Sequence, residues 1–168
     1  MKAHMVLVAV TILLVLTIGA LSFAGEPPRL QASSALSIEG TYKPSSRQLP
    51  DGTMQKPPDI MGLLTYTKSH RNFNVIAKDA EGTWNSLALV STYELTPTEY
   101  RETLIYSTRV RGQEISHDLS GETRRVPVTV EDGRIQFKLP FEPPAVVVEG
   151  NKLTATADGR VDVWEKVP

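Results

Sequence analysis

Apolar and polar residues alternate along most of the chain after residue 37, and this period of two predicts β-strands. Leu87–Leu95 shows the clearest alternation, and no segment after residue 24 keeps the 3.6-residue period of an amphipathic helix. The expected strands are Ile38–Lys43, Gly62–Thr67, Asn72–Lys78, Leu87–Leu95, Glu99–Val110, Arg124–Glu131, Arg134–Pro140, Ala145–Glu149, Lys152–Ala157 and Arg160–Lys166.

Three two-residue turn signals divide the last part of the chain into short strands. They are Asp132-Gly133, Gly150-Asn151 and Asp158-Gly159. Each pair suits a tight turn with positive φ, which is the geometry that joins neighbouring antiparallel strands. The C-terminal third is therefore predicted to be an antiparallel meander.

Glu99–Val110 is the longest expected strand, and its alternation assigns a face to each residue. The face predicted to be buried carries Tyr100, Glu102, Leu104, Tyr106 and Thr108. Two proline-bearing or polar stretches, Pro44–Asp59 and Arg111–Thr123, are expected to be connections without strands. Pro127 interrupts its strand and indicates a bulge or an edge position.

Short strands at a spacing of about ten residues are typical of an all-β sandwich or barrel. Closure is favoured because it removes the exposed edges that a set of open strands would leave. The predicted fold is an antiparallel up-and-down β-barrel of about 8–9 strands, lipocalin/calycin-like, formed by residues 38–168.

Residues 1–24 resemble a secretory signal peptide. Lys2 precedes the apolar run Met5–Leu21, and Ser22-Phe23-Ala24 places small residues before a cut at Gly25. Residues 25–37 are then a flexible leader. The alternative is an uncleaved helix that anchors the protein to the inner membrane, because about 20 apolar residues can span a bilayer. Either way the domain is expected to be periplasmic or extracellular, with a membrane contact only through the uncleaved segment.

Composition excludes several classes of protein. The chain has 18 basic and 19 acidic residues, a formal net charge of −1, and therefore lacks the basic surface of a nucleic-acid binder. It has no cysteine, so it forms no disulfide and its stability must come from its core.

Short motifs at both ends of the predicted barrel resemble the bacterial lipocalin-like domain family. Gly40-Thr41-Tyr42 begins the first strand, Gly62–Thr67 forms the second, and Val163–Lys166 ends the last. The resemblance implies a barrel with one plugged end, one open mouth and a cavity for a small ligand. It also implies closure by Tyr42, Trp164 and Lys166, although the family usually has Trp where Tyr42 stands and Arg where Lys166 stands.

The residues give little support for catalysis. After the signal segment the chain has two histidines, His70 and His117, at no spacing that suits a metal, so no metal or cofactor is expected. Ser116-His117-Asp118 has the residue types of a hydrolase triad, but neighbours on a strand point to opposite faces and cannot converge. No catalytic residue is assigned.

The candidate ligand-binding residues are polar groups on faces expected to be buried, and a turn histidine near one end of the barrel. Glu102 is the most informative, since a buried carboxylate needs a partner, a ligand or water at a barrel mouth. The full set is Tyr66, His70, Tyr93, Tyr100, Glu102 and Tyr106. The predicted function is binding of a small, largely apolar molecule inside the barrel. Two alternatives stay open: an isomerase or cyclase that uses a buried carboxylate or tyrosine, and a structural or interaction domain with a filled barrel.

Overall fold

The computed structural model describes residues 36–168, so the predicted signal peptide and most of the leader lie outside the described residues. This range contains strands and turns, and no helix in it is long and apolar enough to cross a bilayer. The strands are β1 (Gly40–Gln48), β2 (Met54–Gln55), β3 (Ile60–Tyr66), β4 (His70–Lys78), β5 (Trp84–Leu95), β6 (Glu99–Arg111), β7 (Glu114–Asp118), β8 (Thr123–Glu131), β9 (Arg134–Lys138), β10 (Ala145–Glu149), β11 (Lys152–Ala157) and β12 (Arg160–Lys166).

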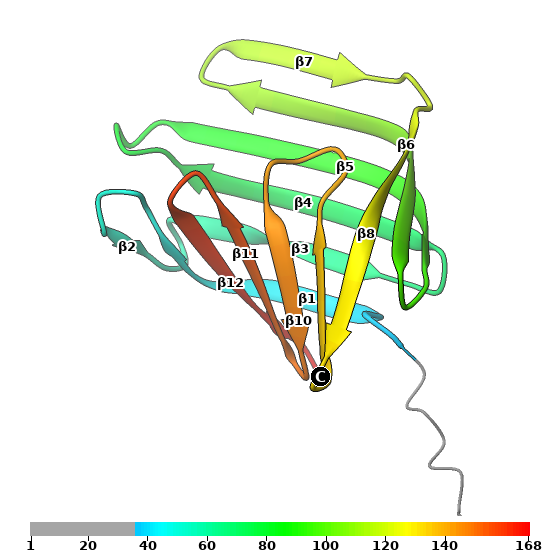
Figure 1. Cartoon of the computed structure of the whole chain (residues 1–168). Helices are drawn as coiled ribbons and strands as arrows, with labels where there is room; N and C mark the ends of the chain where they lie inside the picture. The colour runs from blue at the N-terminus through cyan, green and yellow to red at the C-terminus, as the bar shows by residue number, and fades with distance from the viewer. Residues whose placement is uncertain (1–35) are drawn as a thin grey trace, which may run out of the picture. The chain divides into compact units, whose positions relative to one another are not determined.

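The strands form a closed antiparallel barrel (Figure 1). Neighbours along the chain pair in order, and the ring closes where β1 pairs β12, with Tyr42 opposite Lys166 and Gln48 opposite Val161. β2 pairs only β1, and β7 pairs only the second half of β6. The predicted all-β barrel is confirmed. Its ring has ten strands, one for each of the ten ranges expected from sequence, so the predicted barrel size of about 8–9 strands was too small. A wider ring leaves more room inside.

Two stretches expected to lack strands contain them. The first strand continues through Pro44 to Gln48, because the register shifts between Pro44 and Ser46 and this bulge tolerates the proline. The polar stretch Arg111–Thr123 contains β7, which extends the sheet beyond the barrel wall. Figure 1 shows β7 beside β6, at the top of the view.

The predicted turns are confirmed by their backbone angles. Asp132 and Gly133 have φ of 49° and 77°, and Asp158 and Gly159 have φ of 50° and 77°. At the third turn Gly150 alone of the pair has a positive φ, at 57°. Glycine, asparagine and aspartate adopt this conformation more readily than other residues, which is why these turns were readable from sequence.

Pro127 lies where β8 changes its partner. Residues from Thr123 to Pro127 pair β6, and those from Val128 to Glu131 pair β9. The missing N–H of the proline is therefore placed where one ladder ends and the next begins.

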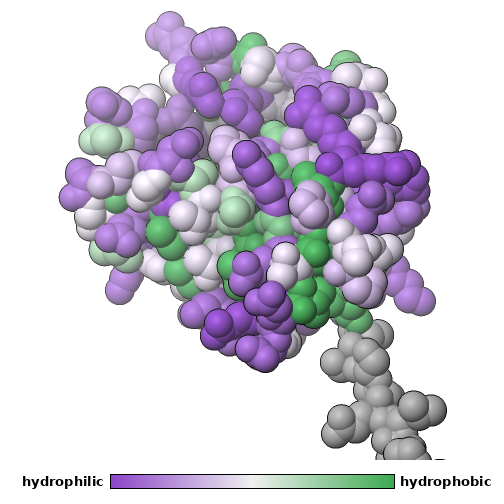
Figure 2. Space-filling view, viewed as in Figure 1, coloured by the Kyte–Doolittle hydropathy of each residue, from purple (hydrophilic) through white to green (hydrophobic). Residues whose placement is uncertain are grey.

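Aromatic side chains fill the barrel end at which β1 begins. Tyr66, Tyr93 and Tyr100 follow one another with ring centroids 5.2 and 5.7 Å apart, and Tyr100 stacks on Phe137 at 4.4 Å. Ile38 is buried against this cluster and accepts a hydrogen bond of 3.1 Å from the Tyr42 hydroxyl through its carbonyl oxygen. This end of the barrel is therefore closed by packing. The outer surface drawn in Figure 2 is mostly polar, with apolar side chains gathered toward the lower middle.

Candidate functional site

A cavity of about 940 Å³ opens at the other end of the barrel. It is bordered by the strand ends around residues 47–51, 78–86, 109–112 and 157–160. The inward positions of β3, β4, β5, β10, β11 and β12 supply apolar walls, since alternate residues of a barrel strand face the interior. The main apolar lining residues are Leu64, Phe73, Val75, Leu87, Val146, Leu153 and Trp164.

The inner end of the cavity is aromatic. Phe73 and Trp164 lie with ring centroids 5.5 Å apart, and the indole of Trp164 is almost completely buried. Both residues line the cavity, together with Tyr66. These rings separate the cavity from the aromatic cluster that plugs the closed end.

A buried ionic cluster lies beside these rings. The Arg71 guanidinium donates from Nη1 to Glu102 Oε1 at 3.1 Å and from Nη2 to Glu142 Oε1 at 2.6 Å. Ser91 Oγ donates to the same Glu102 oxygen at 2.5 Å. Arg71 is inward because it is in phase with Phe73 on β4, and its side chain is only 1% exposed. Burial opposes the charge on Arg71, but Glu142, Tyr66 and Glu102 raise the pKa of the guanidinium above its ordinary value.

Four polar atoms near this cluster have no hydrogen-bond partner among the described residues. They are the hydroxyls of Tyr66 and Tyr100, Nε of Arg71 and Oε2 of Glu102. Burial raises the pKa of Tyr66 and of Tyr100 above the ordinary value, so both hydroxyls stay protonated and able to donate. Tyr66 and Arg71 also line the cavity, but these unpaired atoms have almost no accessible surface and are buried behind its wall.

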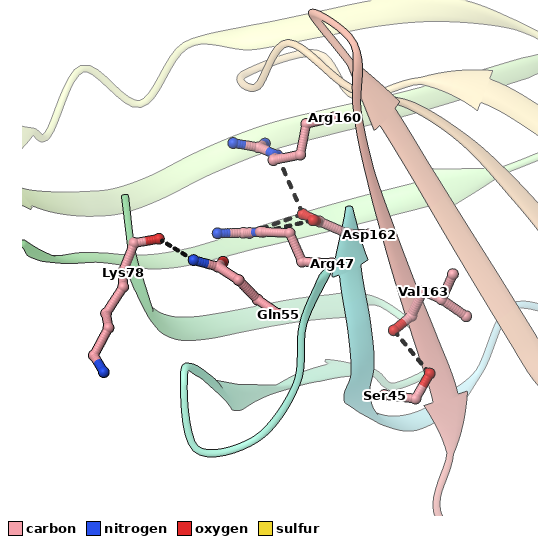
Figure 3. A network of polar contacts seen from close by, with 7 residues as sticks. All are labelled: Ser45, Arg47, Gln55, Lys78, Arg160, Asp162 and Val163. Atoms are coloured by element: carbon pink, nitrogen blue, oxygen red, sulfur yellow. Dashed lines mark hydrogen bonds and ion pairs between the residues drawn. The ribbon is translucent and has the colours of Figure 1, made fainter. Parts of the chain in front are cut away.

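The rim of the cavity has a second buried ion pair (Figure 3). Arg47 on β1 donates to both oxygens of Asp162 on β12, at 2.6 and 2.8 Å, and Arg160 lies 3.5 Å from the same carboxylate. Gln55 Nε2 donates to the Lys78 carbonyl oxygen at 3.2 Å and thereby joins β2 to the end of β4. The bidentate pair links the two strands that close the ring, so it supports both closure and the shape of the mouth.

The face predicted for Tyr106 is wrong because β6 contains a bulge. Val90 pairs Tyr106 but Ser91 pairs Leu104, so Ile105 is an extra residue without a partner on β5. Tyr106 therefore turns outward and is 38% exposed. Thr108 turns outward with it, and the inward face passes to Ser107, Arg109 and Arg111.

The other candidate ligand residues are distributed as follows. Glu102 and Tyr100 are inward and buried, but neither lines the cavity. Tyr93 is buried in the plug and donates to the Thr67 carbonyl oxygen at 2.5 Å. His70 is exposed at the start of β4, at the barrel end opposite the opening. Of the six candidates, Tyr66 alone lines the cavity.

The three proposed closure residues lie on the strands that close the barrel. Tyr42 is 1% exposed, and Trp164 forms part of the cavity floor. The Lys166 side chain lies over Gly40, where an added Cβ would be 2.1 Å from its Cε. Within residues 36–168 no cation–π contact joins Lys166 to Tyr42. In the same range no three histidine or carboxylate side chains converge as metal ligands would.

Sequence reasoning missed most charged residues of the site, including the rim pair of Arg47 and Asp162, and three others show why. Arg71 lies just outside the expected strand Asn72–Lys78, although its place two residues before Phe73 puts it in the inward phase of β4. Arg109 was assigned to the outer face because the bulge at Ile105 carries no glycine or proline to reveal it. Glu142 lies in a proline-rich connection without periodicity, so nothing in the sequence indicated that it reaches Arg71.

Comparison with known proteins adds one structural likeness. No family model and no curated protein matches the chain. A lipocalin-like protein from Bacteroides uniformis matches with a TM-score of 0.35 and 15% sequence identity, over 77% of this chain and 98% of that chain. The assignment of the barrel stands on its own strand pairing and does not depend on this match.

Proposed function

We propose that the protein is an exported, lipocalin-like binding protein that holds a small, largely apolar molecule inside its barrel. The observation that carries the proposal is the cavity of about 940 Å³ with aromatic and aliphatic walls. Small-molecule sites are commonly concave, mostly apolar and about 300–1,000 Å³ in volume. The sequence motifs that resemble the lipocalin-like family agree with this use of the barrel.

The ligand would bury its apolar part against Phe73, Leu87 and Trp164. Desolvation of apolar surface supplies the main free energy of such binding, at about 25 cal/mol per Å². The unpaired donors of Tyr66 and Arg71 have almost no accessible surface, so the inner end offers a ligand few polar contacts. The geometry thus supports binding of one molecule with limited polarity.

The two alternative functions receive less support. A filled barrel does not agree with a cavity of this volume. An enzyme that uses Glu102 would need substrate to reach that carboxylate, but Glu102 pairs with Arg71 and does not line the cavity. Carriage or storage of a ligand requires neither proton transfer nor a nucleophile.

Export is part of the proposal and rests on residues 1–24. Intact-mass measurement of the protein purified from the host envelope distinguishes the two forms of export. A mature chain that begins at Gly25 supports cleavage, whereas a chain that begins at Met1 and remains in the membrane fraction supports the anchor.

Ligand binding is tested with the neutral apolar dye Nile red, whose fluorescence rises in apolar surroundings. We expect saturable, one-to-one binding to the wild-type protein. Ala155 lines the cavity from β11, so Ala155→Phe fills the space and should weaken dye binding at least tenfold.

Ala88→Phe is the matched control, because Ala88 lies on the outer face of β5 and outside the cavity. It should leave binding unchanged. The proposal fails if the wild-type protein does not bind the dye, or if Ala155→Phe binds as well as Ala88→Phe while both remain folded by circular dichroism.

A further inference from the structure

The bulge in β6 places an arginine at the mouth of the cavity. Before the bulge Tyr100, Glu102 and Leu104 face inward, and after Ile105 the inward face passes to Ser107 and Arg109. Arg109 is half-buried and lies opposite Leu87, which also lines the cavity. Bulges often re-aim a side chain beside a functional site, and this one turns a cation from solvent toward the interior.

Arg109 differs from the other buried or half-buried cations of the cavity in its partners. Within residues 36–168, no ion pair or side-chain hydrogen bond involves Arg109. The others pair with carboxylates: Arg47 and Arg160 with Asp162, Arg71 with Glu102 and Glu142, and Lys78 with Asp59. A half-buried guanidinium gains most from an anionic partner, because its donors form a fork that matches a carboxylate.

The inner end of the cavity has the opposite preference. There Arg71 already contacts two carboxylates, Glu102 and Glu142. Val75 and Leu87 are cross-strand partners, and so are Leu87 and Arg109. Val75 and Arg109 therefore lie at the same level of the barrel. Arg71 is four residues before Val75 along β4, so at about 3.3 Å per residue it lies about 13 Å deeper in the barrel than Arg109. An anion brought to Arg71 would meet two carboxylates that already occupy that guanidinium. Asp51, Asp79, Glu81 and Asp158 also line the cavity near its mouth, but none of them pairs with Arg109, so its guanidinium is open to an anionic head.

We propose that the ligand is a single-chain amphiphile with a carboxylate head, bound with the head at Arg109 and the chain directed toward Phe73 and Trp164. This inference rests on the proposed binding function and adds the ligand's chemical class and orientation. Arg109 is then the residue that determines specificity for the acidic head, and the apolar walls between Leu87 and Trp164 accept the chain.

The test compares dodecanoate with dodecanol, which share a chain and differ in the charge of the head. Binding is measured by displacement of Nile red at low salt, below the concentration at which either amphiphile aggregates. A charge-assisted hydrogen bond predicts that the wild-type protein binds dodecanoate about tenfold or more tightly than dodecanol. Arg109→Gln should abolish this preference by weakening dodecanoate binding, with dodecanol binding unchanged. Arg109→Lys should keep part of the preference, because the charge remains without the fork.

Arg125→Gln is the matched control. Arg125 is exposed on the outer face of β8 and takes part in no ion pair within the described range, so this variant should keep the full preference. The inference is overturned if dodecanol binds the wild-type protein as tightly as dodecanoate, or if Arg109→Gln keeps the preference. Failure of Nile red itself to bind would instead overturn the proposed function.

Discussion

Arg71→Met is expected to destabilise the domain strongly, because it leaves a fully buried carboxylate without a cation. Glu102 is 0% exposed, and after the change its remaining side-chain partner is the Ser91 hydroxyl. Glu142 is 6% exposed but lies in a connection, so it can turn toward water. Breaking a buried pair by removing one partner costs about 3–5 kcal/mol. A domain of this size has a free energy of unfolding of about 5–15 kcal/mol, so the variant should still fold.

Urea unfolding, followed by the fluorescence of the two tryptophans Trp84 and Trp164, measures this loss. With a slope of about 2 kcal/mol per molar urea, a loss of 4 kcal/mol lowers the midpoint by about 2 M. Arg134→Met is the control, since the Arg134–Glu149 pair has a similar distance of 3.1 Å but both side chains are about half exposed. Its loss should be within about 1 kcal/mol.

The double variant Arg71→Met/Glu102→Met tests whether the lost stability comes from the unpaired, buried Glu102 carboxylate. Replacement of a buried ion pair by apolar side chains of similar size is often neutral, so the double variant should recover most of the stability. The reasoning is refuted if the double variant is as unstable as Arg71→Met or less stable. The two residues would then contribute by packing, with additive effects and no electrostatic coupling.

Two further predictions concern the backbone and the tyrosines. Gly62→Ala should lower the free energy of unfolding in urea by about 2–4 kcal/mol, because φ is +151° and a Cβ would lie 2.1 Å from the Asn74 carbonyl oxygen. Gly52→Ala is the control, since φ is +87° but the space around it is open, and it should lower the same free energy by about 1–2 kcal/mol. Equal losses for the two variants would contradict the steric argument. Burial raises the pKa of Tyr93 to about 12 and raises those of three other tyrosines. The folded pKa of Tyr93 exceeds the unfolded value of about 10, so the stability that this residue contributes is complete below pH 10 and is lost as the pH rises through about 12. Absorbance at pH 11 should therefore show fewer tyrosinates per molecule in the folded protein than in the urea-unfolded chain, and equal numbers would contradict the burial. The four protected residues are Tyr42, Tyr66, Tyr93 and Tyr100.

The parts of the fold that sequence predicted are those specified by neighbouring residues. The turn at Asp132-Gly133 and the alternation in Leu87–Leu95 need only local information, since each reflects the conformation of a few residues. The polar candidates depended on register, which is set by pairing between strands. One extra residue, Ile105, exchanged the faces of Tyr106 and Arg109, because a shift of one position turns every following side chain over. Glu142 reaches Arg71 across 71 residues of sequence, and no local pattern encodes that contact.

The pairing of β1 with β12 also determines when the domain can form. Arg47 and Asp162 are separated by 115 positions, so the ring cannot close before nearly the whole chain is available. Contacts between such distant segments make folding slow, because a long loop must be ordered before any of them forms. A chain with this architecture stays open while its end is still being made. For a protein that we propose is exported from its N-terminal end, β12 crosses the membrane after the other strands of the ring, so the barrel can close only outside the membrane.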